Sequence, residues 1–210
     1  MNPLVHIIDD DSSLRLALSR LLSAAGYRVE VHESADDFLR KEREEEIGCI
    51  LLDINMPGLS GVQLQEHLAQ QLNNLPIVFL TGHGDIAMSV RAIKAGAEDF
   101  LAKPVAKEEL LDAVQRALQR CRDGHDHASN LKELHGRINS LTPREREVFD
   151  LLVTGMLNKQ IAYQLGNTER TVKAHRHSIM EKMRVRSMAE LASIASQLGI
   201  LKKAEKAPHD

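Results

Sequence analysis

Short apolar runs alternate with amphipathic stretches through the first 120 residues. Five runs have the length of strands, and those at Leu4–Asp9, Cys49–Ile54 and Ile77–Thr81 are almost continuously apolar. The remaining two are Arg28–His32 and Asp99–Lys103. A continuous apolar run is typical of a strand that is buried on both faces of a sheet. The pattern therefore predicts a five-stranded sheet with cover on both sides.

The amphipathic stretches between these runs have the period of helices. Between Ser12 and Ala25, for example, Leu14, Leu18 and Leu22 recur along one helix face. The other helices predicted in this half are Ala35–Arg43, Gly61–Leu72, Ile86–Ala95 and Lys107–Cys121. Strands that alternate with helices form parallel sheets. We therefore expect an α/β doubly wound, flavodoxin-like domain with five parallel strands.

The pattern changes after Cys121. The polar segment 122–140 contains two glycines and little periodicity, and it is interpreted as a linker with partial helical character. From Leu141 all signals are helical, and Asn158–Leu165 and Glu169–Met183 flank a short turn in the manner of a helix-turn-helix. The predicted organisation is a first domain at 1–121, a linker at 122–140, a small all-α domain at 141–200 and a disordered tail at 201–210.

The two halves of the chain also differ in charge. Residues 1–120 carry 12 Lys and Arg against 19 Asp and Glu, whereas the remaining residues carry 15 against 11. The first half thus has a net charge of −7 and the second a net charge of +4. Within Arg170–Arg186 six side chains are basic and only Glu181 is acidic. This asymmetry favours two domains, of which the second is a candidate for contact with nucleic acid.

Several classes of protein do not fit this sequence. No apolar run is long enough to span a bilayer, and the first eight residues lack the features of a signal peptide. Two cysteines, Cys49 and Cys121, do not make a disulfide framework. We therefore expect no membrane partner and a location in the cytoplasm.

Acidic residues recur where the predicted strands end. Asp9 and Asp10 end the first strand, Asp53 ends the third, and the fourth and fifth end in Thr81 and Lys103. The carboxyl ends of parallel strands meet at one edge of the sheet, where ligands bind. Clustered carboxylates repel one another unless they share a cation, and an all-oxygen cluster suits Mg²⁺. The sequence therefore predicts a magnesium site at this edge.

A second interpretation is that the acids after the first strand only cap the next helix. We favour it for Asp11 and Ser12. It does not explain why acids recur at the ends of two separate strands, so Asp9, Asp10 and Asp53 remain candidates for a chemical site.

The same edge carries the groups that phosphoryl transfer to a carboxylate requires. The reaction needs a nucleophilic carboxylate, a cation beside the phosphoryl oxygens and a hydrogen-bond donor. Asp53, Lys103 and Thr81 are of the right types. Lys103-Pro104 alone is equally typical of a turn after a strand.

Together these motifs resemble the receiver domains of bacterial response regulators, over about Leu4–Arg120. The resemblance implies that Asp53 is the phosphoacceptor, that Thr81 and Lys103 are its catalytic partners, and that Thr81 and Phe100 act as the switch pair. The magnesium ligands that it implies are Asp9, Asp10, Asp53 and the backbone carbonyl of Asn55. It also implies a cis bond at Lys103-Pro104. The segments Met56–Gly58 and Thr81–Asp85 are most similar to the branch that includes the nitrogen-fixation regulator FixJ.

The basic second half has a candidate DNA-reading helix. On Glu169–Met183, Val172, Ile179 and Met183 share a side that can be buried, while basic residues project from another face. A solvated basic face on an ordinary helical bundle is the alternative. The motifs at Leu141–Val148, Asn158–Ala162 and Thr171–His175 resemble the LuxR-type helix-turn-helix over Leu141–Leu198.

The LuxR-type resemblance implies a set of DNA contacts. Lys173, Ala174 and His177 are the candidates for base contacts, although His177 departs from the basic residue often found there. The candidates for contacts to the DNA backbone are Lys159, Thr171 and Arg176. Arg170 is a further candidate because it projects from the same face of the helix as Lys173. The final helix, around Glu190–Leu198, is the dimer face that the family uses.

These features predict a response regulator transcription factor and not an enzyme. The implied partners are a sensor histidine kinase, double-stranded DNA and a second copy of the chain, with RNA polymerase as a further candidate. One rival is an aspartate-nucleophile phosphatase, but such enzymes need an acid where this chain has Asn55. Another is a small-molecule-gated LuxR-type regulator, which needs a roomy aromatic pocket, whereas the first 120 residues contain one tyrosine.

Overall fold

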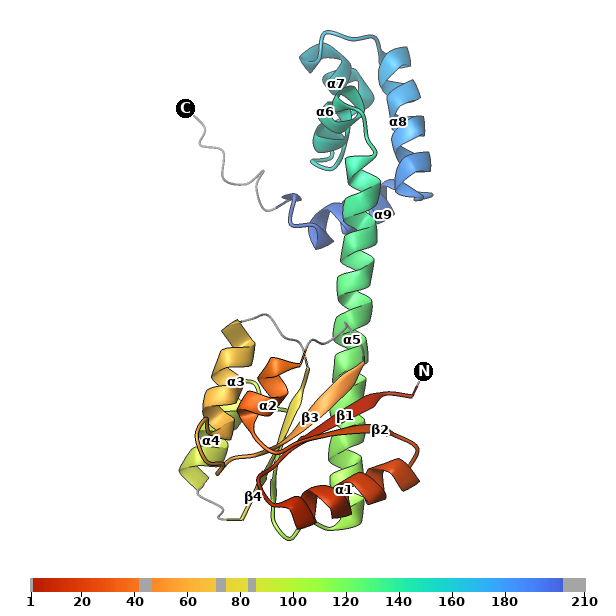
Figure 1. The fold of residues 1–210 in the computed structure, drawn as a ribbon. Helices are drawn as coiled ribbons and strands as arrows, with labels where there is room; N and C mark the ends of the chain where they lie inside the picture. Colours follow the sequence, from red (N-terminus) through yellow and green to blue (C-terminus); the bar gives the residue numbers. More distant parts are fainter. Residues whose placement is uncertain (1, 42–46, 71–74, 83–85, 202–210) are drawn as a thin grey trace. The chain divides into compact units, whose positions relative to one another are not determined.

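The computed structural model describes residues 2–41, 47–70, 75–82 and 86–201 (Figure 1). The chain divides into two compact units, Met1–Asp126 and His127–Asp210. Residues 202–210 of the expected tail at 201–210, and the His83–Asp85 part of the FixJ-like motif, lie outside the described residues. Among the described helices, none is long and apolar enough to cross a membrane.

The first unit is the predicted doubly wound α/β fold. Its parallel sheet has the order β2-β1-β3-β4-β5. The strands are β1 Leu4–Ile8, β2 Arg28–His32, β3 Gly48–Asp53, β4 Ile77–Thr81 and β5 Asp99–Ala102. The intervening helices are α1 Ser12–Ala24, α2 Ala35–Arg40, α3 Gly61–Gln70 and α4 Ile86–Lys94, followed by α5 Lys107–Asn139.

Two apolar layers cover the two faces of the sheet. On one face, α1 and the first part of α5 pack on side chains such as Val5, Ile7 and Leu51. On the other, α2, α3 and α4 pack on Ile8 and Phe79. β1, β3 and β4 are buried along their whole length, as their apolar runs predict. These strands are therefore a rigid base for side chains at their carboxyl ends.

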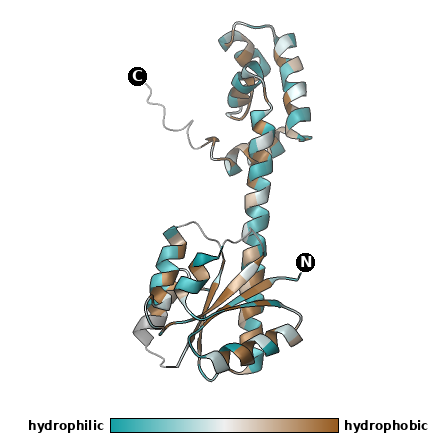
Figure 2. Ribbon diagram, in the orientation of Figure 1, coloured by the Kyte–Doolittle hydropathy of each residue, from teal (hydrophilic) through white to brown (hydrophobic). Residues whose placement is uncertain are grey.

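The predicted end of the fifth helix at Cys121 is wrong, because α5 continues to Asn139 through most of the segment predicted as a linker. Its middle is largely polar (Figure 2). Its last turns bury Leu134 and Ile138, and Ile138 belongs to the core of the second unit. Arg137 also donates to the Met183 carbonyl at 3.1 Å. This packing outweighs the cost of two helical glycines, which local propensity alone counts against the helix.

The second unit is all helical, as predicted. Its further helices are α6 Pro143–Leu152, α7 Asn158–Gln164, α8 Glu169–Met183 and α9 Met188–Gln197. A capping box begins α6, since Glu145 N donates to Thr142 Oγ1 at 3.3 Å and Thr142 N to Glu145 Oε2 at 2.8 Å. The Thr168 side chain caps α8 through the Thr171 amide, at 3.1 Å. These caps set where the helices begin.

Candidate functional site

Four strands bring the predicted chemical residues to one edge of the sheet. Asp9 and Asp10 follow β1, Asp53 ends β3, Thr81 ends β4 and Lys103 follows β5. One carboxylate oxygen from each of Asp9, Asp10 and Asp53 lies within 4.8 Å of the other two. We refer to Asp9, Asp10, Asp53 and Lys103 together as the acidic pocket.

The Lys103 ammonium lies between two carboxylates of the acidic pocket. Its Nζ donates to Asp9 Oδ2 at 2.6 Å and lies 3.2 Å from Asp53 Oδ2. Asp9 is fully buried and Asp53 is 6% exposed, whereas Asp10 is open to solvent. The pocket thus holds three acids and one base, and the negative charge exceeds the positive charge.

Burial and neighbouring charges shift the pKa values of two groups in the pocket. Burial raises the pKa of the Asp53 carboxyl above its ordinary value, Lys103 opposes this shift, and the nearby Asp9 adds to it. Burial by itself lowers the pKa of the Lys103 ammonium, but the hydrogen bond to Asp9 and the two carboxylate charges raise it overall. Lys103 therefore stays charged, while the protein around Asp53 disfavours its negative form.

The residues of the acidic pocket fit a hard divalent cation. All three acidic side chains offer carboxylate oxygens, which Mg²⁺ prefers as ligands. A bound cation relieves the repulsion that raises the pKa of Asp53. The cluster is thus consistent with a Mg²⁺ site, as the sequence predicts.

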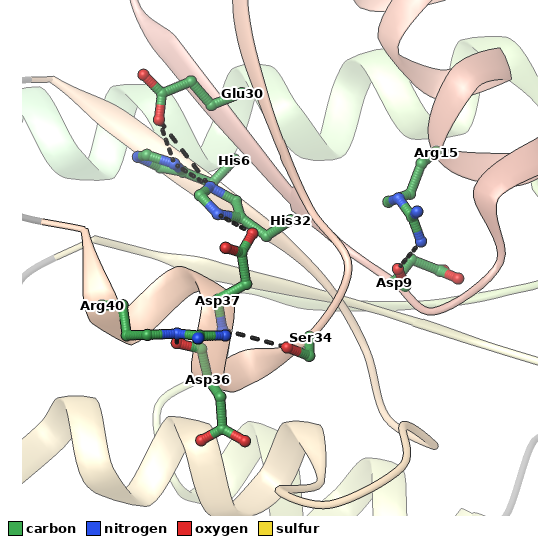
Figure 3. A network of polar contacts seen from close by, with 9 residues as sticks. All are labelled: His6, Asp9, Arg15, Glu30, His32, Ser34, Asp36, Asp37 and Arg40. Atoms are coloured by element: carbon green, nitrogen blue, oxygen red, sulfur yellow. Dashed lines mark hydrogen bonds and ion pairs between the residues drawn. The ribbon is translucent and has the colours of Figure 1, made fainter.

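The residues around the pocket have separate local roles. Asp11 caps α1 by accepting from the amides of Ser13 and Leu14, at 2.8 and 3.2 Å, so its interpretation as a capping residue is confirmed. The Asp9 carbonyl accepts from Arg15 Nη1 at 2.5 Å (Figure 3). At Gly61 a Cβ atom would lie 2.3 Å from the Asp53 carbonyl oxygen, so only glycine lets α3 begin so close to β3.

The predicted switch residues lie beside the pocket on β4 and β5. Thr81 is buried, and its carbonyl accepts from the Lys103 amide at 2.6 Å. The Phe100 ring is half-buried and packs against Phe79 with 6.4 Å between ring centroids. The Lys103-Pro104 bond is cis, as expected. Asn55 is exposed in the turn after β3.

In the second unit, α8 presents the predicted polar face to solvent. Val172, Ile179 and Met183 are buried in the core, which confirms the predicted inward side. The candidate DNA contacts that are exposed are Arg170, Lys173, Ala174 and His177 on α8 and Lys159 on α7, while Thr171 and Arg176 are half-buried. Their spacing leaves one face of α8 free for a groove of DNA.

A shallow surface groove extends this face toward the end of α8. Its lining consists of the basic residues and His177, together with one acid and two apolar residues: Lys173, Arg176, His177, Arg184, Arg186, Glu181, Met180 and Val185. The sequence pattern had marked Arg184 and Arg186 only as members of a basic stretch. Their place in the groove makes them further candidates for phosphate contacts, since basic side chains along one surface attract a nucleic acid backbone.

An ion pair between a buried carboxylate and a partly exposed lysine joins α6 and α8. Glu145 is 5% exposed, and its carboxylate accepts from Lys182 Nζ and Ser178 Oγ, both at 2.6 Å, as well as from the Thr142 amide. The hydrogen bond from Lys182 is the largest of the effects that lower the pKa of Glu145 to about 2. We refer to these four residues as the Glu145 cluster. The sequence pattern did not indicate the contact with Lys182, which lies 37 residues further along the chain.

Comparison with known proteins agrees with both units. Residues 5–115 match the response regulator receiver domain, and residues 139–201 match the family of bacterial regulatory proteins called the luxR family. Nodulation protein W of Bradyrhizobium diazoefficiens is 43% identical over 197 residues, which cover 94% of this chain and 87% of that protein. The transcriptional regulatory protein FixJ of Rhizobium meliloti is 37% identical over 191 residues, covering 91% and 94%.

A solved structure supports the same assignment. That of the response regulator StyR is 46% identical in sequence, with a TM-score of 0.84, and the match covers 94% of this chain and 100% of that one. This chain therefore belongs to the two-component response regulators that join a receiver domain to a LuxR-type helix-turn-helix, in the FixJ branch. It is a transcription factor rather than a phosphatase, and its receiver domain replaces the ligand-binding domain that a small-molecule-gated regulator would need.

Membership of this family implies two partners. A receiver domain implies a histidine kinase, and a helix-turn-helix implies DNA. The acidic first half and the basic second half of the chain are thus the input and output ends of one regulator.

Proposed function

We propose that a sensor histidine kinase phosphorylates Asp53 and that this modification controls dimerisation and sequence-specific DNA binding. The observation that supports this most directly is the position of the Lys103 ammonium, 3.2 Å from Asp53 and 2.6 Å from Asp9. A cation held at that point can contact a phosphoryl group on Asp53. Burial is the largest of the effects that raise the pKa of Asp53, and the nearby Asp9 adds to it.

The proposed reaction is a transfer between a kinase histidine and a carboxylate of this chain. An Asp53 carboxylate oxygen attacks phosphorus, the phosphorus–nitrogen bond of the phosphohistidine breaks, and an aspartyl phosphate results. Mg²⁺, held by Asp9, Asp10, Asp53 and the Asn55 carbonyl, would offset charge on the phosphoryl oxygens. The Lys103 ammonium and the Thr81 hydroxyl then bind those oxygens. As Thr81 moves, the half-buried Phe100 of the neighbouring strand β5 turns inward.

The proposed output is DNA binding by a dimer. Lys173, Ala174 and His177 contact base edges, supported by their exposed positions on α8. The proposed contacts to the DNA backbone are Lys159, Arg170, Thr171 and Arg176. Two copies joined through α9 would read two half-sites. Since coupling between two sites is typically about 1–3 kcal/mol, phosphorylation should raise DNA affinity roughly 5–150-fold.

The test is phosphorylation of matched variants. Wild type, Asp53→Asn and Asp112→Asn are each incubated with a radiolabelled small phosphodonor and Mg²⁺, and acid-labile label is counted. Asp112 is an exposed acid on α5 and serves as the control. We expect wild-type labelling in the control and none in Asp53→Asn, together with a phosphodonor-dependent rise in operator affinity that Asp53→Asn lacks. Full labelling of Asp53→Asn, mapped to another residue, would overturn the proposal.

A further inference from the structure

A second group of metal-ligating side chains lies in the receiver unit, away from the acidic pocket. Among the residues that the structure describes, His6, Glu30 and His32 are the other set whose ligand atoms all lie within 4.8 Å of one another. Figure 3 shows the two imidazoles side by side with the Glu30 carboxylate next to them. None of the three belongs to the phosphoryl chemistry proposed for Asp53.

Strand pairing and one helix bring the three side chains together. In the parallel pairing of β1 with β2, His6 lies opposite Glu30 and Ile8 lies opposite His32. Residues two apart on a strand share a face, so Glu30 and His32 both lie on the same side of the sheet as His6. Phe38 of α2 covers both imidazoles edge-on, at centroid distances of 5.3 and 5.1 Å. Packing therefore holds both rings in place.

The distances match those of a bound zinc ion. His6 Nδ1 and His32 Nε2 are 3.3 Å apart, and Glu30 Oε2 lies 3.8 and 4.0 Å from these two nitrogens. Ligands at ~2.05 Å on a tetrahedral zinc ion lie about 3.3–3.4 Å from one another. The two nitrogens are thus already at the separation that zinc requires. The carboxylate needs to approach by about 0.5 Å, which a side chain can do by rotation.

We propose that His6, Glu30 and His32 form a zinc-binding site, with water as the fourth ligand. The ligands are His6 Nδ1, His32 Nε2 and a carboxylate oxygen of Glu30. Two imidazoles and one carboxylate are a ligand set that zinc favours over Mg²⁺, which prefers oxygen alone. The Glu30 side chain is 44% exposed, so an ion can enter from solvent although both histidines are buried.

The surroundings of His32 complete the pattern of a metal-binding histidine. Such a histidine usually donates its second ring N–H to a carboxylate. His32 Nδ1 is buried without a well-formed hydrogen bond, and its nearest acid is Asp37, with Oδ2 at 3.4 Å. Zinc on Nε2 would place the ring proton on Nδ1, facing this carboxylate.

The alternative is that the two rings only hydrogen-bond to each other across 3.3 Å. Zinc titration of the whole chain distinguishes the two, with excess Mg²⁺ present to saturate the acidic pocket. The variants are Glu30→Gln, which removes a ligand, and Glu33→Gln, an exposed acid just after β2 that serves as the matched control. The chain has ten histidines, so weak binding elsewhere is common to all samples and cancels in this comparison.

We expect wild type and Glu33→Gln to bind one zinc ion that Glu30→Gln binds at least 10-fold more weakly. Binding should also slow hydrogen exchange of β1 and β2 amides in wild type, because a ligand of the folded state suppresses its opening. With Co²⁺ as a spectroscopic probe, the absorption of tetrahedral cobalt should appear in wild type and fall in His32→Gln. Equal zinc affinity in Glu30→Gln and Glu33→Gln, or no protection of β1 and β2, would overturn the proposal.

Discussion

Each unit pairs a partly exposed lysine with a buried carboxylate, with opposite effects on the pKa of that carboxylate. In the acidic pocket Lys103 is shared by Asp9 and Asp53, and the pKa of Asp53 is raised. In the Glu145 cluster Lys182 pairs with one carboxylate, and the pKa of Glu145 is lowered to about 2. The same residue types therefore make an unbalanced site in one unit and a balanced one in the other.

The Asp53 and Glu145 carboxylates differ in how completely their surroundings compensate the negative charge. The Glu145 carboxylate accepts hydrogen bonds from a lysine, a hydroxyl and an amide, so its negative form is the stable one. The acidic pocket leaves negative charge uncompensated, which disfavours the folded state until a cation binds. Unbalanced buried charge marks a site that binds a ligand, and balanced buried charge marks one that holds helices together.

Removing Glu145 should have the largest effect on stability. Glu145→Ala leaves the Lys182 ammonium without its partner and destroys the α6 capping box, so we expect a loss of about 3 kcal/mol from the second unit. Hydrogen exchange of α6 and α8 amides measures this unit separately. Glu147→Ala is the control, because Glu147 forms an exposed pair with Arg144 that should contribute less than about 1 kcal/mol. Equal losses in the two variants would contradict a special role for the cluster.

Adding Mg²⁺ should stabilise the unbalanced site alone. At a concentration 100-fold above its Kd, a ligand of the folded state contributes about 2.7 kcal/mol. We expect hydrogen exchange of β1 and β3 amides to slow accordingly, while α6 and α8 amides do not change. Asp10→Ala should remove most of the Mg²⁺ effect. The control Asp11→Asn, at the residue that caps α1, should retain the Mg²⁺ effect. A Mg²⁺ effect of the same size in Asp10→Ala would contradict the proposed ligand set.

Sequence pattern was sufficient for the receiver fold and for the acidic pocket. Buried strands with continuous apolar runs, such as Leu4–Ile8 and Ile77–Thr81, have few other interpretations. Once these strands are parallel, the residues that end them meet at one edge without further information. This is why Asp9, Asp53 and Lys103 were predictable together.

Pattern was insufficient where a contact depends on register or on distant packing. The pairing of His6 with Glu30 follows from the register of β1 against β2, which no local signal specifies. Lys182 reaches Glu145 only through the crossing of α8 over α6. The helix beyond Cys121 contains Gly124 and Gly136, and it depends on tertiary burial of residues such as Ile138 rather than on propensity.

Lys173 on α8 can be compared with Lys103 and Lys182. It is exposed and forms no ion pair with another described residue. An unpaired cation on a solvent face is available to DNA. Lys173→Ala should cost about 1–3 kcal/mol at the base pair it contacts and relax sequence preference there. Lys159→Ala should instead weaken all sequences alike and reduce the salt dependence of binding. Fluorescence anisotropy with operator and scrambled DNA measures both, and an unchanged preference in Lys173→Ala would mean that another face of α8 meets the DNA.

The smallest expected effect is the pH dependence of stability. Its sign should differ between the acidic pocket and the Glu145 cluster. Burial and Asp9 raise the pKa of Asp53 in the folded state. The contribution of Asp53 to stability is therefore full below its unfolded pKa of about 3.9 and is lost as pH rises through the folded value. Asp53→Asn, which is neutral at every pH, should then stabilise the receiver unit at pH 7 without Mg²⁺. The gain should shrink as pH falls toward the unfolded value of about 3.9 and vanish well below it, because Asp53 is then protonated in both states.

Glu145 should behave in the opposite way over the same acidic range. Its pKa is lowered to about 2, chiefly by the hydrogen bond from Lys182, so its contribution is full above an unfolded pKa of about 4.3 and is lost as pH falls toward 2. Glu145→Gln should therefore destabilise the second unit at pH 7 and do so progressively less below pH 4. Hydrogen exchange measured from pH 3 to pH 7, and corrected for intrinsic rates, reports the stability of each unit separately within one sample. If Asp53→Asn destabilised the receiver at pH 7, the Lys103–Asp53 attraction would outweigh burial and repulsion, and the acidic pocket would be a balanced site after all.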